Sequence, residues 1–402
     1  MRSLTSFLVE ESTEEKLKHL EHPEDHPIKS GEAGFHHAFN TLKTTAETLQ
    51  GHDTGTRLMT KYDGAPSVVF GHHPETGKFF VASKSAFNKD PKINYSEADI
   101  MKNHGHAPGL VNKLKAALKH LPKVAPKNGV FQGDFLYNKA DDDVQQDAKG
   151  NYNFKPQLIN YQAKKGSEQA AKIARAKMGF YVHTGYKGTN LENMKADYTP
   201  DTSGFKQHAD VHMHHWHEGF DAKRAKYTDA EHAQFKNEMN KAGKILTGSD
   251  KHALFGAMHG LDQDHITTYI NKSVVHGEQP TVEGLAKHVA QRHQKAIDSV
   301  KTDKAKAQKT AAMQADQAHI KTNKTHLANL LQMNQHLQNA KNALLPALTR
   351  GDTTGYKYSI NGQDSTAEGT VAVTKENRPT KYVNRGTGGF AQVNLSKGGF
   401  NK

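Results

Sequence analysis

The chain of 402 residues is basic, since 54 Lys and Arg residues against 42 Asp and Glu residues give a formal net charge of +12, and only 35% of its residues are hydrophobic. This length allows two or three domains, and the low hydrophobic content indicates that a large part of the chain forms a thin core or solvated helices. The absence of cysteine excludes disulfides, zinc–thiolate sites and thiol nucleophiles, whereas the basic balance favours a polyanionic partner.

The first 50 residues are predicted to be helical. Residues 12–15 form a capping-box pattern before residues 16–20, and residues 30–49 carry apolar side chains at helical spacing as far as Gly51. The simplest interpretation is a helix packed on the domain that follows. Residues 6–11 resemble the N-termini of tailed-bacteriophage proteins, in which Leu-x-Glu can be a maturation-protease site.

Residues 56–198 change to strand patterns, interrupted by a helical stretch at 108–121. Parallel βαβ units are not evident, so the pattern predicts an α+β fold with an antiparallel sheet. The predicted strands of this part lie between turn signals, at residues 57–62, 66–71, 78–84, 129–136, 157–162 and 178–184.

The sequence Lys61-Tyr62-Asp63-Gly64 stands between the first two of these strands. It reads as the end of a short strand, a tight Asp-Gly corner and the start of a second apolar strand. Alternation in an extended chain would put Lys61 and Asp63 on the same face, which holds an amine at the rim of a sheet within reach of a ligand. On this motif alone, a surface hairpin with a solvated lysine is the alternative.

From about residue 200 to residue 348 the composition shifts to Ala, Lys, Gln, His and Asn, with helix formers nearly continuous over 281–345. Residues 301–350 contain eight Lys and Arg residues against Asp303 and Asp316, which is half of the net charge of +12. Two interpretations are open: a helical bundle with a solvated basic face, or a basic arm that lies along a phosphate backbone.

Five histidines also crowd around Trp216 at the start of this block. On a helix, His208, His212 and His215 would share a face, which could bind a transition metal. A polar surface or interface cluster is the alternative for these histidines.

Strand patterns return at 355–360, 368–374 and 379–385, so the helical block looks inserted within the β core. The predicted organisation has an N-terminal helical segment, a core in two parts and an inserted basic helical domain between them. Their bounds are 1–52 for the N-terminal segment, 53–199 and 349–402 for the core, and 200–348 for the insertion.

Lys61-Tyr62-Asp63-Gly64 resembles the nucleotide-accepting motif of the covalent nucleotidyltransferases, the superfamily of ATP-dependent DNA ligases, RNA ligases and mRNA capping enzymes. The resemblance implies an antiparallel nucleotidyltransferase (ATP-grasp-like ligase) core with a large all-α insertion. It covers roughly residues 56–198 and 351–385. Further motifs of the superfamily have counterparts in the same order, at residues 83–85 (Ser-Lys-Ser), 131–137, 179–183, and 368–373 with 381–383.

The resemblance implies that Lys61 attacks the α-phosphorus of ATP, expels pyrophosphate and forms a lysyl-AMP phosphoramidate. Only a neutral amine can attack, and an ordinary lysine is almost fully protonated at pH 7. Nearby cations would lower its pKa, and Lys84 and Lys381 are the candidates. The residues expected to bind the nucleotide are Lys61, Asp63, Gly64, Lys84, Asp134, Phe180, Glu368 and Lys381.

A divalent metal, Mg²⁺ or Mn²⁺, is expected to neutralise the phosphates through oxygen ligands. Glu368 is the first candidate ligand and Asp134 the second, although Asp134 could instead accept a hydrogen bond from the ribose. Phe180 or Tyr181 would stack on the adenine. Each of three residues also has an ordinary structural interpretation: a core position for Phe180, a hairpin turn at Glu368 and a solvated strand end at Lys84.

Some positions depart from the superfamily pattern. Met59-Thr60 stand where many ligases have a glutamate, which leaves ATP or GTP open, and Gly133-Asp134 replaces the usual Gly-Glu. The final motif keeps one of its two lysines, with Arg385 a candidate substitute. Residues 384–402 alone follow that motif, where DNA ligases and capping enzymes have an oligonucleotide-binding barrel, so an RNA-ligase-like protein fits better.

The expected function is therefore an ATP-dependent polynucleotide ligase that seals 5′-phosphate and 3′-hydroxyl ends, of RNA rather than DNA. The alternatives are another covalent nucleotidyltransferase, or a non-catalytic nucleic-acid-binding or phage structural protein on a ligase-like fold. No apolar run has the length of a membrane span, and residues 1–9 are too short for a secretory signal. We expect a soluble protein of the cytoplasm (the host cytoplasm if phage-encoded), with nucleic-acid ends as partner and no inferable stable protein partner.

Overall fold

The computed structural model describes residues 20–397 and divides the chain into two compact units. The first unit consists of Leu20, Gly55–Asp221 and Gly351–Pro379, and holds most of the strands. The second unit is mainly helical and consists of Glu21–Thr54, Ala222–Arg350 and residues 380–397. The fold is thus α+β, as predicted, whereas the specific nucleotidyltransferase core stays a prediction.

The division differs from the predicted domains at three places. Residues 21–52 of the predicted N-terminal segment and residues 380–397 belong to the helical unit, instead of standing alone or completing the β core. The boundary expected after residue 199 lies after Asp221, because a strand at Val211–His215 joins the sheet of the first unit. The suggested protease site at residues 6–11 and the capping box at residues 12–15 lie outside the described residues.

The largest sheet of the first unit has six strands in the order β10-β8-β4-β2-β3, with β9 paired to β8. Neighbouring strands are antiparallel except that β10 runs parallel to β8 at one edge. The bounds are β2 Ser67–His72, β3 Phe79–Ala82, β4 Val130–Asn138, β8 Met178–Lys187, β9 Lys195–Asp197 and β10 Val211–His215.

Two further β elements belong to the first unit. Strand β1 (Arg57–Lys61) pairs antiparallel with β13 (Gly369–Val373). A five-stranded antiparallel sheet has the order β12-β11-β7-β6-β5. Its strands are β5 Val144–Gln146, β6 Tyr152–Phe154, β7 Asn160–Ala163, β11 Lys357–Ile360 and β12 Gln363–Ser365.

The corner at Asp63-Gly64 leads from β1 in one sheet to β2 in another, so it does not close the hairpin that the sequence suggested. Gly64 is needed there because a Cβ atom would lie 2.6 Å from the Cβ atom of Asp134 on β4. Real side chains do not approach so closely. The corner therefore rests directly against the large sheet.

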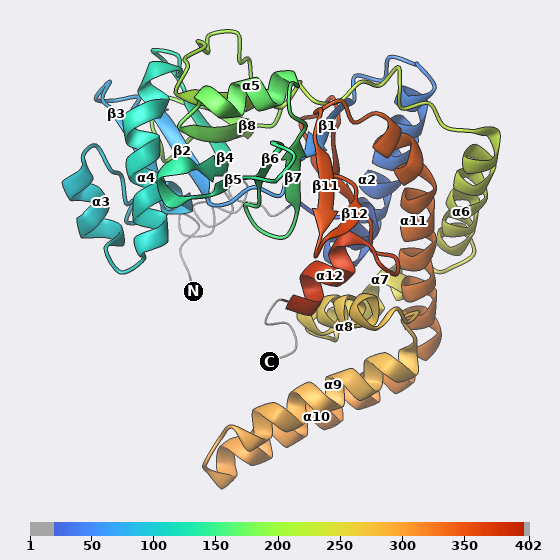
Figure 1. Ribbon diagram of the computed structural model, residues 1–402. Helices are drawn as coiled ribbons and strands as arrows, with labels where there is room; N and C mark the ends of the chain where they lie inside the picture. Colours follow the sequence, from blue (N-terminus) through green and yellow to red (C-terminus); the bar gives the residue numbers. More distant parts are fainter. Residues whose placement is uncertain (1–19, 398–402) are drawn as a thin grey trace. The chain divides into compact units, whose positions relative to one another are not determined.

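Helices α3 (Glu97–His104) and α4 (Pro108–His120) cover one face of the large sheet (Figure 1). Leu114 of α4 packs with Phe135 and Phe180 from the sheet, and all three side chains are fully buried. A capping box of Ser96 and Asp99 begins α3, and Pro108 occupies the first turn of α4. Helix α5 (Glu168–Arg175) precedes β8. The apolar side chains on one face of the large sheet thus pack against α3 and α4.

The second unit is built around its longest helix, α11 (Lys324–Arg350), which packs against α6, α7 and α2. Leucines at helical spacing form the buried side of α11, among them Leu327, Leu330, Leu337 and Leu344. The remaining elements are η1 Pro23–Asp25, α2 His26–Leu49, α6 Asp229–Thr247, α7 Lys251–His259, α8 Gln263–His276, α9 Val282–Asp298, α10 Asp303–Thr322, β14 Pro379–Val383 and α12 Phe390–Lys397.

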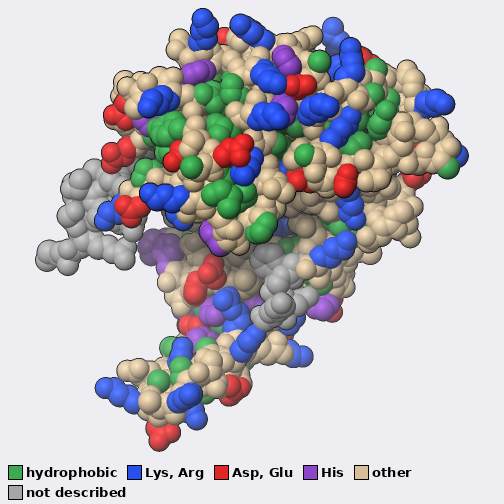
Figure 2. All heavy atoms as spheres, turned by 60° about the vertical axis from the view of Figure 1, so that its left-hand side comes forward, with side chains coloured by type: hydrophobic (Ala, Val, Ile, Leu, Met, Phe, Trp, Pro, Cys, Tyr) green, Lys and Arg blue, Asp and Glu red, His purple; other side chains and the backbone are tan. Residues whose placement is uncertain are grey.

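Helices α9 and α10 form a hairpin that projects from the rest of the helical unit (Figure 1). Between residues 290 and 319 no side chain is fully buried, although Val289 and Ile320 at the base are. Lys and Arg side chains are scattered over its free end among acidic and apolar ones, at the bottom of Figure 2. The hairpin is therefore held to the unit mainly at its base.

A cluster of buried charges joins distant segments of the helical unit. The Lys341 ammonium on α11 forms an ion pair with the Glu24 carboxylate, and both side chains are fully buried. Arg385 donates two hydrogen bonds of 2.7 and 2.8 Å to the Asp25 carboxylate. Such a cluster fixes three segments in one arrangement, because any unpaired member would be a buried charge.

Each predicted strand overlaps an observed one, and the predicted helices at 30–49 and 108–121 correspond to α2 and α4. The region after residue 200 departs from the prediction, since β10 is a strand within a stretch expected to be helical. None of the helices within residues 20–397 combines the length and the apolar character that crossing a membrane requires.

Candidate active site

Lys61 is the last residue of β1, and the pairing of that strand decides its neighbour. In the β1–β13 ladder Lys61 lies opposite Gly369, so Glu368 directly precedes the paired segment. The Lys61 Nζ donates a hydrogen bond of 2.6 Å to the Glu368 Oε2. The two side chains are 24% and 11% exposed, so solvent reaches both partners of the ion pair. Residues 307 positions apart in the chain thus meet at one strand end.

A cavity of about 110 Å³ opens beside the Lys61 side chain. Lys84 lies on its wall, just after the end of β3, and aromatic rings from Tyr62 and Tyr181 form another part of it. The ring centroids of these two tyrosines are 4.6 Å apart. The full lining is Leu20, Met59, Lys61, Tyr62, Lys84, Gln132, Asp134, Tyr181, His183, Thr184, Tyr198, Val371 and Val373.

The floor of the cavity comes from alternating positions of β4 and β8. Gln132 and Asp134 stand two residues apart on β4, as Tyr181 and His183 do on β8. The Asp134 Oδ1 lies 3.4 Å from the His183 Nε2. The Gln132 amide donates a 2.7 Å hydrogen bond to the Ser67 hydroxyl on β2. These contacts hold the polar side chains in place on the face of the sheet opposite to Phe135 and Phe180.

The charges around Lys61 act against its use as a neutral amine. Burial alone would lower the pKa of the Lys61 ammonium, but the carboxylates of Glu368, Asp134 and Asp63 outweigh burial and raise it. The expectation that neighbouring cations lower this pKa is therefore wrong for the protein without ligands. Burial raises the pKa of Asp134, yet His183, Ser67 and Lys61 together lower it, so Asp134 is an anion at neutral pH.

Phe180 was expected to stack on a base, and this expectation is wrong. Its side chain is fully buried in the core under α4, where its ring meets Phe70 and Phe135 edge to face. The pleat of β8 turns the next residue, Tyr181, to the cavity instead. Tyr181, the other candidate of the sequence analysis, is the aromatic residue of β8 that faces the cavity.

Asp63 does not face the cavity either. It lies beyond the end of β1, where strand alternation no longer applies, and its buried carboxylate accepts hydrogen bonds from the backbone N–H groups of Leu158 and Ile159, at 2.6 and 2.8 Å. Its backbone N–H donates to the Tyr161 hydroxyl at 2.7 Å. Asp63 therefore fixes the corner that positions Lys61 and does not reach a ligand directly.

The remaining expected residues fall into three groups. Lys84 and Asp134 line the cavity with Lys61, and Glu368 pairs with Lys61. Gly64 lets the corner approach β4, as its close contact with Asp134 requires. Lys381 lies on β14 in the helical unit, where its N–H donates to the Glu21 carbonyl, and its part in the site stays a prediction.

Gln132, His183 and Tyr62 were not expected to line the cavity. Alternation could have identified the first two, because Gln132 is two residues from Asp134 and His183 two residues from Tyr181 on predicted strands. No local signal identifies Tyr62, since a tyrosine just after a strand faces a core or a cavity depending on the corner that follows.

The histidines near Trp216 do not form the predicted metal face. His212 and His214 are buried on one side of β10, because the segment is a strand. The His212 Nδ1 lies 3.1 Å from the Tyr137 hydroxyl, and the His214 Nε2 lies 3.1 Å from the Tyr356 hydroxyl. Burial lowers the pKa of His214 to about 3, so it is neutral. These histidines are hydrogen-bonded parts of the core.

Comparison with known proteins gives one family. The family of unknown function DUF6267 matches residues 17–398. The chain belongs to this family. The match spans both units, and no curated protein and no solved structure matches the chain.

Proposed function

We propose that the protein is a covalent nucleotidyltransferase that accepts AMP from ATP on Lys61 and uses it to seal polynucleotide ends, of RNA rather than DNA. The observation that supports this proposal is the convergence at one cavity of residues that the ligase-like motifs single out. Lys61, Lys84 and Asp134 line it, Tyr181 adds an aromatic ring, and Glu368 pairs with Lys61. These residues come from five separate places in the sequence.

The proposed first step forms a bond between the Lys61 Nζ and the α-phosphorus of ATP. The bond from that phosphorus to the bridging oxygen breaks, and pyrophosphate leaves with its electron pair. The amine must lose a proton, and the Glu368 carboxylate at 2.6 Å is its nearest acceptor. Lys84 supplies a positive charge for the phosphates. Tyr181 and Tyr62 supply an aromatic surface for the base.

The later steps use the same activated phosphorus. The 5′-phosphate of a polynucleotide attacks the phosphoramidate, the nitrogen–phosphorus bond breaks, and Lys61 regains its amine. A 3′-hydroxyl then displaces AMP and joins the strands. The basic hairpin α9–α10 of the helical unit is our candidate for phosphate contacts. Its lysines Lys301, Lys304 and Lys306 are exposed, so a polynucleotide backbone can reach them.

Asp134 and Glu368 fit a hard divalent cation by their donor type. Both offer carboxylate oxygens, and their side chains are 20% and 11% exposed. A bound Mg²⁺ or Mn²⁺ would supply positive charge that stabilises the phosphates and disfavours the ammonium form of Lys61. The same two carboxylates raise the pKa of Lys61 in the protein without ligands.

The size of the cavity bears on how a nucleotide binds. At about 110 Å³ it is smaller than the roughly 300–1,000 Å³ of typical small-molecule sites. It can enclose only part of a nucleotide in this conformation. We therefore expect the Lys61–Glu368 ion pair to open when ATP binds, which widens the site and frees the amine together.

Incubation with ATP labelled at the α-phosphate and Mg²⁺, followed by a denaturing gel, tests the proposal. The wild-type protein should keep the label, and Lys61→Ala should lose it because alanine has no amine to accept the nucleotide. Lys61→Arg should also fail, since a guanidinium is not deprotonated in proteins. Lys78→Ala changes an exposed lysine in the turn before β3 and should label normally.

Other outcomes separate the alternatives. Labelling by GTP in preference to ATP would indicate a different nucleotidyltransferase. Labelling that persists in Lys61→Ala would contradict the assignment of the site. A wild-type protein that takes no label from any nucleotide would contradict the enzymatic proposal and leave the non-catalytic alternative.

A further inference from the structure

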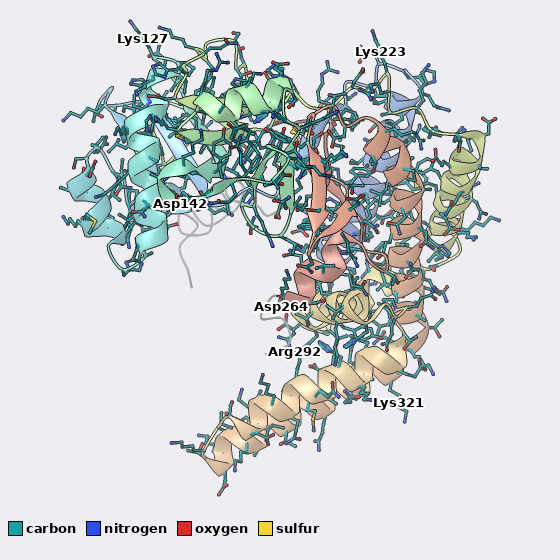
Figure 3. The ribbon with its side chains drawn as sticks, in the orientation of Figure 1. Lys127, Asp142, Lys223, Asp264, Arg292 and Lys321 are labelled. Atoms are coloured by element: carbon teal, nitrogen blue, oxygen red, sulfur yellow. The ribbon has the colours of Figure 1, made fainter. Side chains whose placement is uncertain are left out.

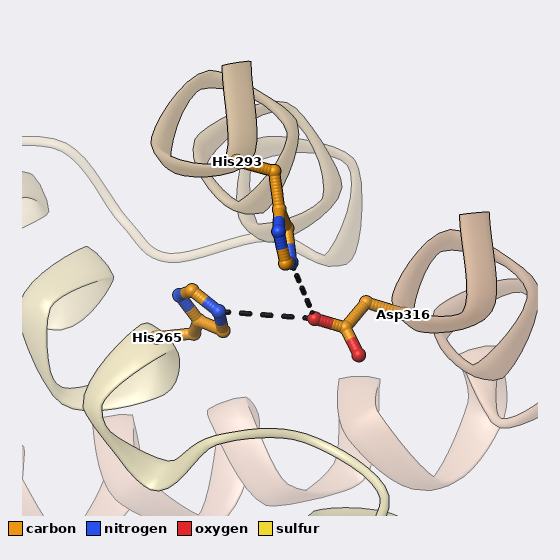
Figure 4. Close-up of side chains that lie close together, drawn as sticks. All are labelled: His265, His293 and Asp316. Atoms are coloured by element: carbon orange, nitrogen blue, oxygen red, sulfur yellow. Dashed lines mark hydrogen bonds and ion pairs between the residues drawn. The ribbon is translucent and has the colours of Figure 1, made fainter. Parts of the chain in front are cut away.

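Three side chains that could bind a metal meet at the base of the α9–α10 hairpin. His265 stands in the first turn of α8, His293 in α9 and Asp316 in α10. Their ligand atoms all lie within 4.8 Å of one another. Figure 4 shows both imidazoles turned toward the Asp316 carboxylate, with one Asp316 oxygen 2.7 Å from the His293 Nε2 and 3.7 Å from the His265 Nε2.

His265 lacks the hydrogen bonds that a buried imidazole normally has. The residue is only 8% exposed, and its Nδ1 has no partner among the described residues. Its Nε2 points at the Asp316 oxygen from 3.7 Å, which is too long for a hydrogen bond. The long contact leaves the Nε2, the His265 nitrogen that faces Asp316, available to a ligand bound between these side chains.

A His–Asp hydrogen bond explains only part of the cluster. The close contact between His293 and Asp316 satisfies one imidazole. The second imidazole is aimed at the same oxygen and gains nothing from it. Two imidazole nitrogens and one carboxylate oxygen that face a common point are, by contrast, the donor set of zinc sites with three protein ligands.

The distances suit such an ion. Zinc binds histidine nitrogen and carboxylate oxygen at about 2.0–2.2 Å, so neighbouring ligand atoms around a tetrahedral ion are roughly 3.4 Å apart. The observed separations of 2.7 and 3.7 Å lie on either side of that value. Small side-chain movements would therefore admit an ion, with a fourth position left for water.

A neighbouring hydrogen bond also joins the hairpin to α8. Arg292, labelled in Figure 3, precedes His293 in α9, and its guanidinium donates a 2.9 Å hydrogen bond to the hydroxyl of Thr268 in α8.

We propose that His265, His293 and Asp316 bind a divalent transition-metal ion of the zinc type, which fastens the α9–α10 hairpin to α8. The hairpin needs such a fastening because no side chain between residues 290 and 319 is fully buried. The ligands come from three helices, so the ion restrains both arms of the hairpin at its base. This site is independent of the Lys61 cavity and of the proposed nucleotidyl transfer.

The test is metal binding by the full chain after treatment with a chelator. Competition of Zn²⁺ with a chromophoric chelator should reveal one tight equivalent, and Co²⁺ should give the visible absorption of a tetrahedral ion. His265→Ala and Asp316→Asn should each weaken that equivalent by at least about tenfold, because even loss of an outer partner of a metal ligand costs that much. His276→Ala, an exposed histidine on α8, should not.

Hydrogen exchange separates a metal clamp from a merely structural cluster. Zn²⁺ should slow amide exchange over residues 282–322 in the wild type and in His276→Ala but not in Asp316→Asn, which keeps the side-chain size. Circular dichroism checks that the variants fold. A wild type without a tight equivalent, or ligand variants that keep it, would overturn the proposal, and the wild-type result alone decides if a variant fails to fold.

Discussion

Lys61 in the first unit and Lys341 in the helical unit each pair with a glutamate, yet their surroundings shift their pKa values in opposite directions. Burial favours the neutral amine at both places. Around Lys61 the carboxylates of Glu368, Asp134 and Asp63 outweigh burial and raise the pKa. Around Lys341 burial prevails over Glu24, the nearby Arg385 adds to it, and the pKa falls to about 8.

The two lysines differ in whether a ligand could reach the carboxylates around them. Lys341 is fully enclosed, and its partners Glu24 and Asp25 have no exposed carboxylate to offer a ligand. The side chains of Lys61 and Glu368 are 24% and 11% exposed beside a cavity. Carboxylates that solvent can reach, such as those of Glu368 and Asp134, are suited to an incoming cation. A closed set of balanced charges is suited to holding segments together.

The largest expected contrast is in stability. Lys341→Met should lower the free energy of unfolding by about 3–5 kcal/mol, because it leaves Glu24 and Asp25 buried with too little positive charge. Lys61→Met should change it by less than about 1 kcal/mol, since its ion pair is reached by solvent. Denaturant titration checks both. Trp216, the single tryptophan, reports the first unit by fluorescence, and circular dichroism reports the helices.

Similar losses of stability in the two variants would contradict the distinction between a structural and a ligand-facing lysine. A Lys341→Arg variant is the matched control. It keeps the positive charge but not the shape, so a cost close to that of Lys341→Met would assign the effect to packing instead of charge.

The pH dependence of stability should differ in sign at the two lysines. Between pH 8 and the ordinary lysine value of 10.5, the unfolded chain holds more protons at Lys341 than the folded protein does, so this residue makes stability rise with pH. Lys61, with its raised pKa, contributes stability that is complete below pH 10.5 and is lost as the pH rises through its folded value.

Denaturant titrations at several pH values between 8 and 10.5 measure this effect. The difference in unfolding free energy between the wild type and Lys341→Met should grow with pH in that window. A difference that stays flat, or shrinks, would show that Lys341 is fully protonated throughout.

Polynucleotide binding and enzyme–AMP formation should depend on different parts of the chain. Reversing Lys301, Lys304, Lys306 and Lys309 to glutamate should weaken polynucleotide binding about tenfold and flatten the log–log salt dependence by up to about 0.9 units for each phosphate that the hairpin no longer binds. Formation of the enzyme–AMP adduct does not use the four lysines of the hairpin and should be unchanged. Binding and labelling across a salt series measure both. An unchanged salt dependence would show that the hairpin does not bind phosphates and that its lysines only face solvent.

The smallest expected effect concerns the ion pair itself. Glu368→Gln keeps the side-chain shape but removes one carboxylate, so the pKa of Lys61 should fall toward its ordinary value. Mass spectrometry of peptides after amine acylation at a series of pH values gives the midpoint for Lys61. That midpoint should move to lower pH, with Lys78 as the exposed internal reference. An unmoved midpoint would mean that Glu368 does not control the amine.

The strands of the first unit could be predicted because β-branched and aromatic residues alternate between turn residues. The site could be predicted only in part. Lys84 and Asp134 belong to motifs that follow Lys61 in the order of the nucleotidyltransferase superfamily. That resemblance led us to expect both residues beside Lys61, and both line its cavity. The choice of Tyr181 over Phe180 depends on which face of β8 meets α4, and no pattern within the strand decides that.

Other features depend on contacts that no local pattern contains. The pairing of Lys61 with Glu368 requires the β1–β13 register across 307 positions. Asp63 lies past the end of its strand, so the alternation rule placed it wrongly. The strand β10 has three histidines and a single β-branched residue, Val211, which made it look helical. The burial of Lys341 in a charged cluster contradicts the ordinary expectation for lysine.

The central claim is that the Lys61 amine accepts a nucleotide. Mass spectrometry of the protein after incubation with ATP and Mg²⁺, first intact and then as peptides, tests it most directly. The claim predicts a gain of one AMP, located on Lys61, that requires Mg²⁺ and is absent from Lys61→Arg. An unmodified protein at saturating ATP, or AMP attached to any other residue, would contradict it.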